Sequence, residues 1–392
     1  MNILHHLSLP LFNMRKADHR QPAESAGYKI CLVRMFFTLF TITFASTEEA
    51  TALLKWKATF KNQNNSLLVS WKPSPDACND RYGVVCFNGR VNRLNIRNAS
   101  VFGTLYAFPF SSLPFLKYVD LSMNNLFGTI PPEIGNLTNL IYLNLSVNQI
   151  SGTIPPQIGS LARIQALHIF ENHLNGSILE EIGYLRITDM KHNNLSGTLP
   201  TTFSIGSALR SFNLDGNKLE GKIPQFLENC QQLEVLDLGD NLLNDTFPMW
   251  LGTLPELRVL SMRLNKLHGS IRTSGSEQMF LELRIFDLSR NDFSKNLPTS
   301  LFQHLKAMRT IDQTSKEPRY LGDSYYHDSV MVSSKGLELE LLQILTIYTT
   351  IDLSNNKFEG YIPSIMGDLI ALLVLNLSHN GLQGHIPPSF FS

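Results

Sequence analysis

The sequence predicts an α/β solenoid, a right-handed coil of stacked repeats with a parallel β-sheet on its concave side. Three observations support this prediction. An LxxLxLxxN pattern recurs along most of the 392 residues, usually at a spacing of 24. Within the pattern, apolar positions alternate with polar ones, as in a short strand that is buried on one side. Another apolar residue, a glycine and an Ile/Leu-Pro pair follow most copies of the pattern.

Residues 140–155, LIYLNLSVNQISGTIP, illustrate what each position does in one repeat. We expect Leu143 and Leu145 to point into the core from the concave strand. Asn148 follows where the chain turns inward, and its amide can bond buried backbone groups that would otherwise be unpaired. Gly152 permits a tight backbone, and the next proline begins the convex side. A period and pattern of this kind are typical of a leucine-rich repeat.

A turn asparagine marks each repeat after the first, in which Ala99 takes its place. These asparagines are Asn124, Asn148, Asn172, Asn193, Asn217, Asn241, Asn265, Asn291, Asn356 and Asn380. The spacing departs from 24 in three places: it is 21 before Asn193, 26 before Asn291 and 65 before Asn356. We divide the chain into a leader (1–45), an N-terminal cap (46–90), an array of about nine repeats (91–298), a non-repeat island (299–347) and two final repeats (348–392).

The island is polar and aromatic and interrupts the repeats. A break of this length inside a regular array is usually a functional loop. Leucines and glutamates alternate over residues 337–341, which predicts that part of the island pairs as a strand. The alternative is a disordered tether between the two parts of the array.

The leader has the features of a secretory signal. Lys29 and Arg34 precede an apolar run over residues 36–45, which ends with small residues at the two positions that a signal peptidase reads. The alternative is a membrane anchor, but an apolar run of about 10 residues falls short of the ~20 that span a bilayer. The net charge of zero and the 17% of charged residues give no indication of a nucleic-acid or polybasic membrane surface.

The cap is predicted to begin with a helix over residues 47–60, because the sequence STEE has the form of a capping box and apolar residues then recur at helical spacing. Cys78 and Cys86 follow, and in a secreted protein this close pair is expected to form a disulfide. A metal site is the alternative, although two thiolates without a second pair or a nearby histidine make a poor ligand set. Cys230 is expected to be a buried apolar side chain.

Eight Asn-x-Ser/Thr sequons favour a glycosylated extracellular surface. They lie at Asn64, Asn98, Asn136, Asn144, Asn175, Asn194, Asn244 and Asn376. Asn144 and Asn376 occupy outward strand positions on the concave face, where a glycan would obstruct a ligand.

These features together resemble the ectodomain of a plant leucine-rich-repeat receptor, with a signal peptide, a cap with paired cysteines, GxIP repeats and an island before the last repeats. The resemblance covers residues 48–388. Residues 46–183 resemble the outer domain of receptor-like kinases. The segments NCQQLEVLDLGDNLLNDTFPMWLGTLPELRVL, DSVMVSSKGLELE and IYTTIDLSNNKFEGYIP resemble the membrane-anchored receptor-like proteins of pathogen perception, which lack a kinase.

The sequence departs from this family in three places. The two styles meet near residues 184–195, at the 21-residue repeat, which suggests a chimaeric gene or a fused gene model. Arg81 stands where such caps commonly have a tryptophan, which predicts a less tightly packed cap. The family continues past the island with more repeats and a transmembrane helix. The resemblance therefore implies a single-pass protein at the extracellular face of the plasma membrane, truncated here at Ser392.

No set of residues points to catalysis. The sequence has no Ser/His/Asp set, paired carboxylates, HExxH, phosphate-binding glycine loop or CxxC pair at usable spacing, so we expect neither an enzyme nor a cofactor or metal site. Aspartates that share one strand position are interpreted as consensus surface polarity: Asp120, Asp237, Asp287 and Asp352. Histidines at variable repeat positions are expected to face solvent: His168, His173, His192 and His268.

The repeats favour binding, because a rigid sheet of parallel strands presents outward side chains from many coils to one extended ligand. The candidate ligand-binding residues flank the strand leucines and are Tyr118, Asp120, Tyr142, His168, Phe170, Asp189, Lys191, Asp215, Asp237 and Arg263. Each of them taken alone is better explained as solvated surface, and only the face as a group supports the hypothesis. The resemblance implies in addition that Tyr325, Tyr326 and Lys335 of the island contact ligand or a co-receptor kinase.

We interpret the chain as a non-enzymatic extracellular recognition module of a plant receptor-like protein. It would bind a peptide or protein in defence or development and signal through partner kinases. The alternative is a secreted inhibitor of cell-wall-degrading hydrolases, which would have uninterrupted repeats and cysteine-paired caps at both ends. A third hypothesis is a fused pseudogene whose product never folds.

Overall fold

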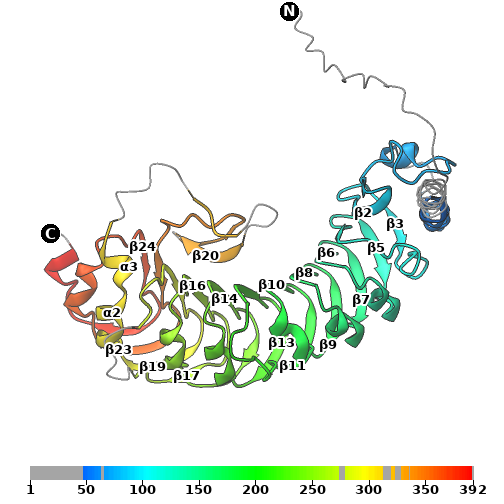
Figure 1. The fold of residues 1–392 in the computed structure, drawn as a ribbon. Coiled ribbons are helices and arrows are strands. Elements are labelled where there is room, and N and C mark those ends of the chain that lie inside the picture. The colour runs from blue at the N-terminus through cyan, green and yellow to red at the C-terminus, as the bar shows by residue number, and fades with distance from the viewer. Residues whose placement is uncertain are drawn as a thin grey trace, which may run out of the picture.

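The computed structural model describes residues 47–62, 66–272, 279–311, 319–322, 328–334 and 336–390. They form a curved solenoid whose coils follow one another along an arc from the cap to the final repeats (Figure 1). The predicted signal peptide, the sequon at Asn64 and the island residues Tyr325, Tyr326 and Lys335 lie outside the described residues. The fold is the leucine-rich-repeat solenoid that the period predicts.

The strands of the repeats form a 12-stranded sheet on the concave side of the arc (Figure 1). Its strands are β1 (Val84–Phe87), β2 (Arg90–Asn95), β4 (Tyr118–Asp120), β6 (Tyr142–Asn144), β8 (Ala166–His168), β10 (Ile187–Asp189), β12 (Ser211–Asn213), β14 (Val235–Asp237), β16 (Val259–Ser261), β18 (Ile285–Asp287), β22 (Thr350–Asp352) and β24 (Val374–Asn376). Only β1 and β2 pair antiparallel within this sheet. Elsewhere each residue lies beside its counterpart one coil away, as Tyr118 lies beside Tyr142, so equivalent side chains form rows along the concave face.

Short parallel strands after the turn asparagines form two more sheets. One contains β3 (Phe102–Thr104), β5 (Asn125–Gly128), β7 (Gln149–Thr153), β9 (His173–Gly176), β11 (Asn194–Thr198), β13 (Lys218–Gly221) and β15 (Leu242–Leu243), and the other contains β17 (His268–Gly269), β19 (Asp292–Asn296), β23 (Lys357–Tyr361) and β25 (Gly381–Gln383). Short 3-10 helices occur in the cap and between the two strand ladders: η1 (Leu67–Ser70), η2 (Pro132–Asn136), η3 (Pro156–Ser160), η4 (Glu180–Tyr184), η5 (Gln225–Asn229), η6 (Met249–Thr253), η7 (Ser364–Asp368) and η8 (Pro388–Phe390). Two α-helices, α2 (Thr299–His304) and α3 (Lys306–Arg309), follow the longest run of repeats.

The turn asparagines have the structural role that the sequence predicts. The Asn148 amide donates to the carbonyl of Leu121 in the preceding coil at 3.1 Å and to that of Leu145 in its own coil at 3.0 Å. Its Oδ1 accepts a hydrogen bond from the N–H of Leu126 at 2.9 Å. The other turn asparagines make equivalent bonds across the array. Each asparagine therefore ties its coil to the preceding one.

A residue in the left-handed region precedes the turn asparagines, which the sequence pattern does not reveal. Val147 has φ 55° and Glu171 has φ 50°, and Gly216 takes the same place with φ 68°. A β-branched residue such as Val147 is disfavoured in this conformation. The backbone N–H of Val147 donates to the carbonyl of Phe170 at 2.9 Å, so bonding to the next coil holds the turn against the local preference.

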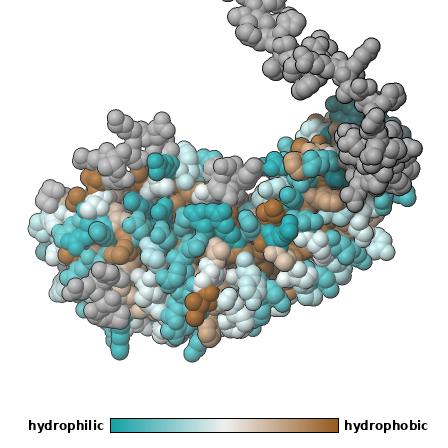
Figure 2. Space-filling model, in the orientation of Figure 1, coloured by the Kyte–Doolittle hydropathy of each residue, from teal (hydrophilic) through white to brown (hydrophobic). Residues whose placement is uncertain are grey.

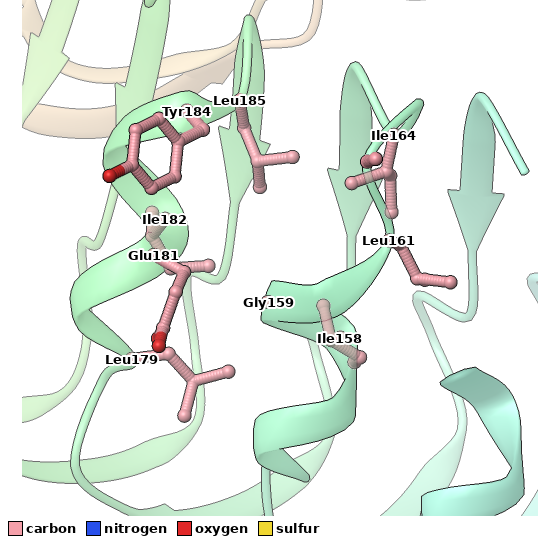
Figure 3. A pocket seen from close by; sticks show the side chains of 10 residues that line it. Ile158, Gly159, Leu161, Ile164, Leu179, Glu181, Ile182, Tyr184 and Leu185 are labelled. Carbon is pink, nitrogen blue, oxygen red and sulfur yellow. The ribbon is translucent and has the colours of Figure 1, made fainter. Parts of the chain in front are cut away.

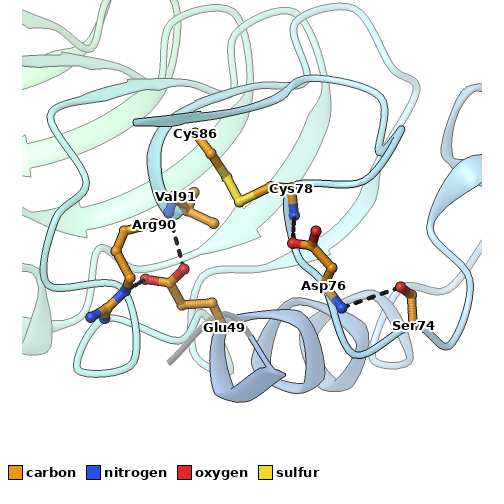
Figure 4. The surroundings of a disulfide bond; sticks show 7 residues. All are labelled: Glu49, Ser74, Asp76, Cys78, Cys86, Arg90 and Val91. Atoms are coloured by element: carbon orange, nitrogen blue, oxygen red, sulfur yellow. Dashed lines mark hydrogen bonds and ion pairs between the residues drawn. A yellow bond between two sulfur atoms is a disulfide. The ribbon is translucent and has the colours of Figure 1, made fainter. Parts of the chain in front are cut away.

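The cap begins with an α-helix over residues 47–57, which ends before the predicted end at 60. The backbone N–H groups of Thr59 and Phe60 bond carbonyls three residues back, and such bonds tighten the last turn of a helix. Glu49 accepts hydrogen bonds from Arg90 Nε at 2.8 Å and from the Val91 N–H at 3.0 Å (Figure 4). Burial raises the pKa of Glu49, and these two bonds oppose the shift. Ser46, the other member of the predicted capping box, lies outside the described residues.

The cap is tightly packed, contrary to the expectation drawn from Arg81. Figure 4 shows the predicted disulfide between Cys78 and Cys86, whose Cα atoms are 5.6 Å apart. Arg81 is 4% exposed, and its guanidinium donates to the carbonyls of Ala50 and Lys72, each at 3.2 Å. Arg81 thus pairs buried backbone carbonyls, a role that a tryptophan with a single N–H could fill only in part.

The 21-residue repeat leaves the concave sheet intact. Strand β10 pairs in register with β8 on one side and with β12 on the other. The segment between η4 and β10 is shortened: Leu185 alone stands where the segment between η3 and β8 has both Leu161 and Ile164. Between η3 and η4 the shortened coil leaves a cavity of about 240 Å³, lined mainly by apolar side chains (Figure 3). The sheet therefore continues, and the shortening is absorbed on the convex side.

The described part of the island contains the strand pairing that its alternating residues predict. Strand β20 (Val330–Ser334) pairs antiparallel with β21 (Leu337–Leu341). Figure 1 shows this hairpin on the concave side of the arc. Glu338 and Glu340 contact basic residues of the coils, whereas Leu337 and Leu339 are 64% and 46% exposed. The hairpin therefore turns its charged edge toward the solenoid.

Candidate ligand-recognition face

The concave face has an open part, over β2–β8, and a part that the island hairpin covers, over β10–β18. We call residues 328–334 and 336–341, which include β20 and β21, the strap. It packs on outward-facing residues of three consecutive coils: Val235, Val259 and Ile285 form an apolar cluster with Leu321, Val330, Val332 and Ile344. This cluster is separate from the main core of the solenoid, because it lies on the outer side of the concave sheet.

Ion pairs fix the charged edge of the strap to the coils. The ammonium of Lys191, just after β10, contacts the Glu340 carboxylate and the Ser329 hydroxyl. Glu338 accepts a hydrogen bond from Arg263 at 2.9 Å and also pairs with Arg290. The side chains of Lys191 and Arg263 are each only 6% exposed, so the strap removes both cations from solvent.

These pairs shift the pKa values of the groups that form them. Burial alone would lower the pKa of Lys191, but Asp189 and Glu340 outweigh it and raise that pKa. The hydrogen bond from Arg263 lowers the pKa of Glu338. Burial would raise the pKa of Glu340, and its contact with Lys191 lowers it instead. The strap is therefore held by ionised partners.

The first residue of the strap is a buried acid with a different environment. Asp328 is 6% exposed, and its Oδ1 accepts a hydrogen bond from the hydroxyl of Ser211 on β12. Burial raises the pKa of Asp328 to about 7, and the nearby acids Asp189 and Glu234 add to the shift. The neighbouring base, Arg210, opposes the shift but is itself bonded to Glu234 at 2.8 Å.

The open part of the concave face carries aromatic and basic side chains in adjacent coils. The guanidinium of Arg93 lies 4.8 Å from the centre of the Tyr118 ring, and the rings of Tyr142 and His168 are 5.3 Å apart. At the boundary with the covered part, the Lys191 ammonium lies 5.1 Å from the centre of the Phe170 ring. Tyr118 and Tyr142 are partly exposed and neighbours in register, so both can contact one ligand.

The structure divides the predicted ligand-binding residues into two groups. Tyr118, Asp120, Tyr142 and Phe170 are partly exposed on the open part. Buried residues make up the other group: His168, Asp189, Lys191, Asp215, Asp237 and Arg263. Lys191 and Arg263 contact the strap directly, so no ligand reaches them while the strap is in place. The expected solvent exposure of His168 is wrong, because its ring packs against Tyr142 in the row of side chains.

The aspartates interpreted as surface polarity are also mostly buried. Asp237, Asp287 and Asp352 are 1–2% exposed, and Asp287 accepts hydrogen bonds from the Ser289 N–H at 2.8 Å and the Ser289 hydroxyl at 2.6 Å. Burial raises the pKa of Asp287 to about 7, with a further contribution from Asp352. These carboxyl groups accept hydrogen bonds from backbone N–H groups two residues further on and so hold the chain where it passes from the strand into the turn.

Sequence reasoning missed the contacts of the strap on the coils, although a signal for them exists. The first outward position of each strand is polar or aromatic in β2, β4 and β6, whereas it is Val235, Val259 and Ile285 in three consecutive later coils. A row of β-branched apolar residues on a face expected to meet solvent indicates that something covers it.

The described residues contain no group of histidine, cysteine, aspartate and glutamate side chains that could hold a metal ion. Within those same ranges, no helix has the length and apolar character needed to cross a membrane. On the face shown in Figure 2, hydrophilic residues predominate and hydrophobic ones gather in small patches.

Comparisons with family models agree with the repeat structure. A leucine rich repeat N-terminal domain model matches residues 46–87, and leucine rich repeat models match residues 115–137, 139–161, 207–267, 349–369 and 371–392. Among curated proteins, the chain is 45% identical over 115 residues to receptor-like protein 43 of Arabidopsis thaliana. That match covers 29% of this chain and 16% of the relative's length.

Solved structures of plant receptor ectodomains share the fold. The ectodomain of the membrane receptor kinase GASSHO1/SCHENGEN3 from Arabidopsis thaliana, in complex with Casparian strip integrity factor 2, aligns with a TM-score of 0.70 and 30% identity over 87% of this chain and 36% of that one. The plant peptide hormone receptor RGFR1, in complex with RGF2, aligns with a TM-score of 0.52 and 26% identity over 72% of this chain and 42% of that one.

Proposed function

Because the chain belongs to the leucine-rich-repeat proteins and is related to the receptor-like proteins of plants, we propose that it is the extracellular ligand-recognition region of such a receptor. The ligand would be an extended peptide or protein segment, as the similar receptors solved with their ligands suggest. Its role would lie in defence or developmental signalling, through partner kinases.

The open concave face of β2–β8 supports this proposal. Its strands are held in register by backbone hydrogen bonds and by the side-chain hydrogen bonds of the turn asparagines. Its side chains therefore need little ordering when a ligand binds. Tyr118 and Tyr142 supply rigid aromatic surface, and Arg93 supplies a positive charge beside them. Aromatic and arginine side chains are the types that most often dominate binding energy. The island also interrupts the array, which favours a receptor over a hydrolase inhibitor.

Substituting the two tyrosines is expected to weaken peptide binding. Peptides selected from a displayed random library against the secreted chain should bind the Tyr118→Ala/Tyr142→Ala variant at least tenfold more weakly, since each anchor contributes about 1–2 kcal/mol. Tyr184→Ala is the matched control, because Tyr184 is 67% exposed at the convex cavity (Figure 3). Equal affinity of the wild type and the double variant would place recognition elsewhere.

We propose that the same protein is secreted and glycosylated. Asn98, Asn136, Asn175 and Asn244 are exposed, whereas Asn144 is buried and its amide donates to the Tyr142 hydroxyl at 3.2 Å. Glycopeptide mass spectrometry of the protein secreted from plant cells is expected to find glycans at the four exposed sites and none at Asn144. A glycan on Asn144 would argue against the ligand face proposed above, because it would cover Tyr142.

A further inference from the structure

Among the described residues, the interface between the strap and the coils carries more acidic than basic side chains. The acidic groups are Asp189, Asp215, Asp237, Asp287, Asp328, Glu338 and Glu340, and the basic groups that face them are Lys191, Arg263 and Arg290. At its edges lie the Arg210–Glu234 pair and His192, whose Nε2 is 3.8 Å from the Asp215 carboxylate. Burying an unneutralised carboxylate is costly, so a closed interface of this composition favours bound protons.

Asp328 differs from the other two acidic residues of the strap, Glu338 and Glu340, in its surroundings. Glu338 and Glu340 each have a cation within contact distance. Asp328 instead faces the Ser211 hydroxyl, two further acids and an arginine that Glu234 already engages. When the strap lifts, the carboxyl group of Asp328 returns to water. The closed and the open positions therefore differ in how they accommodate the charge of this residue.

We propose that closure of the strap takes up protons, so that the hairpin covers the concave face of β10–β18 in weak acid and loosens toward neutral pH. Lys191 and Arg263 lie beneath the strap, so a second segment with carboxylates could reach them only from the open position. Proton uptake would thereby control how much of the concave face a ligand can use. The strap would respond to pH in this way whether or not β2–β8 bind a ligand.

The direction of the effect follows from the pKa values in the closed position. Burial raises the pKa of Asp328 from 3.8 to about 7, and burial likewise raises that of Asp287 to about 7. A raised pKa means that the closed strap binds more protons than the open one. The contribution of these two aspartates to closure is therefore fully present below the ordinary aspartate range and is lost as pH rises through about 7.

Glu338 and Glu340 set the lower limit of this range. Their pKa values are lowered from 4.5, so their ion pairs persist until the pH falls below the usual glutamate range. Below that range they become protonated, and closure weakens again. The strap should thus be held most firmly at about pH 5, between the titration of its glutamates and that of Asp328.

Hydrogen–deuterium exchange of the full chain tests this proposal. Protection of backbone amides in residues 330–341, corrected for the intrinsic rate at each pH, should rise at least tenfold from about pH 7.5 to about pH 5, the direction given by the linkage relation. Amides of β6, far from the strap, serve as the internal reference. Protection that is constant or falls over this range would overturn the proposal, whatever ligand the open face binds.

Two variants assign the effect to Asp328. Asp328→Asn removes the charge and keeps the shape, so it should raise protection near pH 7.5 toward the value that wild type reaches at pH 5. Ser211→Ala removes the hydroxyl that stabilises the ionised form, so it should steepen the pH dependence. Asp80→Asn, at an exposed position in the cap, is the matched control and should behave as wild type. A folded Asp328→Asn protein with the full wild-type pH dependence would contradict the assignment.

Discussion

Replacing Asn148 with alanine is expected to lower the free energy of unfolding by about 3 kcal/mol. The substitution leaves the buried N–H of Leu126 without its partner and removes one of the two asparagine hydrogen bonds that each of the carbonyls of Leu121 and Leu145 accepts. An unpaired buried group costs about 1–3 kcal/mol, and each lost hydrogen bond adds about 1 kcal/mol. Urea unfolding followed by circular dichroism measures the loss.

The same bonds cross from one coil to the next, so the Asn148→Ala variant should also uncouple them. Local exchange of amides in β4 and β6 should rise more than exchange in the cap or in β14, because each coil of a solenoid contacts only its neighbours. Asn125→Ala, at the exposed first position of β5 in the preceding coil, is the control and should change stability by less than about 0.5 kcal/mol. Equal losses of stability from the two substitutions would refute the role assigned to the turn asparagines.

Trp56→Ala is expected to destabilise the cap by about 3–5 kcal/mol, the usual cost of removing a large buried aromatic side chain. Trp56 is fully buried, and its ring centre lies 4.8 Å from those of Phe60 and Phe108. Its indole N–H donates to the carbonyl of Thr104 in the first coil at 3.1 Å, so the residue also joins the cap to the array.

The thermal midpoint and the aggregation state measure the effect of Trp56→Ala. Loss of the cap would expose the apolar end of the first coil, so the variant should aggregate on heating as well as unfold earlier. Tyr106→Ala removes an aromatic side chain that is 87% exposed nearby and provides the comparison. The importance assigned to the cap would be wrong if the two variants melted together.

The fold could be predicted from the sequence because its information is local and repeated. The pattern within one period of 24 residues predicts the strand, the turn and the convex segment of a coil. At the turn position of that pattern, Asn148 bonds its coil to the preceding one. The cap departs from prediction where a residue bonds outside its own segment. Glu49 bonds the N–H of Val91 at the start of the array, and Arg81 pairs the carbonyl of Ala50.

The candidate site could be predicted only in part, because the strap acts over long separations in the chain. Lys191 contacts Ser329, 138 residues further on, and Ser211 contacts Asp328 across 117 residues. Periodicity assigns Lys191 and Arg263 correctly to the concave face but cannot reveal that a distant segment covers them. The row of Val235, Val259 and Ile285 is the one local sign of that cover.

The shortened coil between β8 and β10 has a consequence for how such chains diversify. Three residues fewer than in a regular repeat alter only the convex side, while Ile187 keeps its place between Ala166 and Ser211 in the sheet. Deletions and insertions can thus accumulate on the convex side of the solenoid without shifting the rows of outward-facing side chains on the concave sheet. Coil length and recognition can therefore evolve separately, and two unlike ancestral arrays can be joined within a convex segment and still share one continuous sheet.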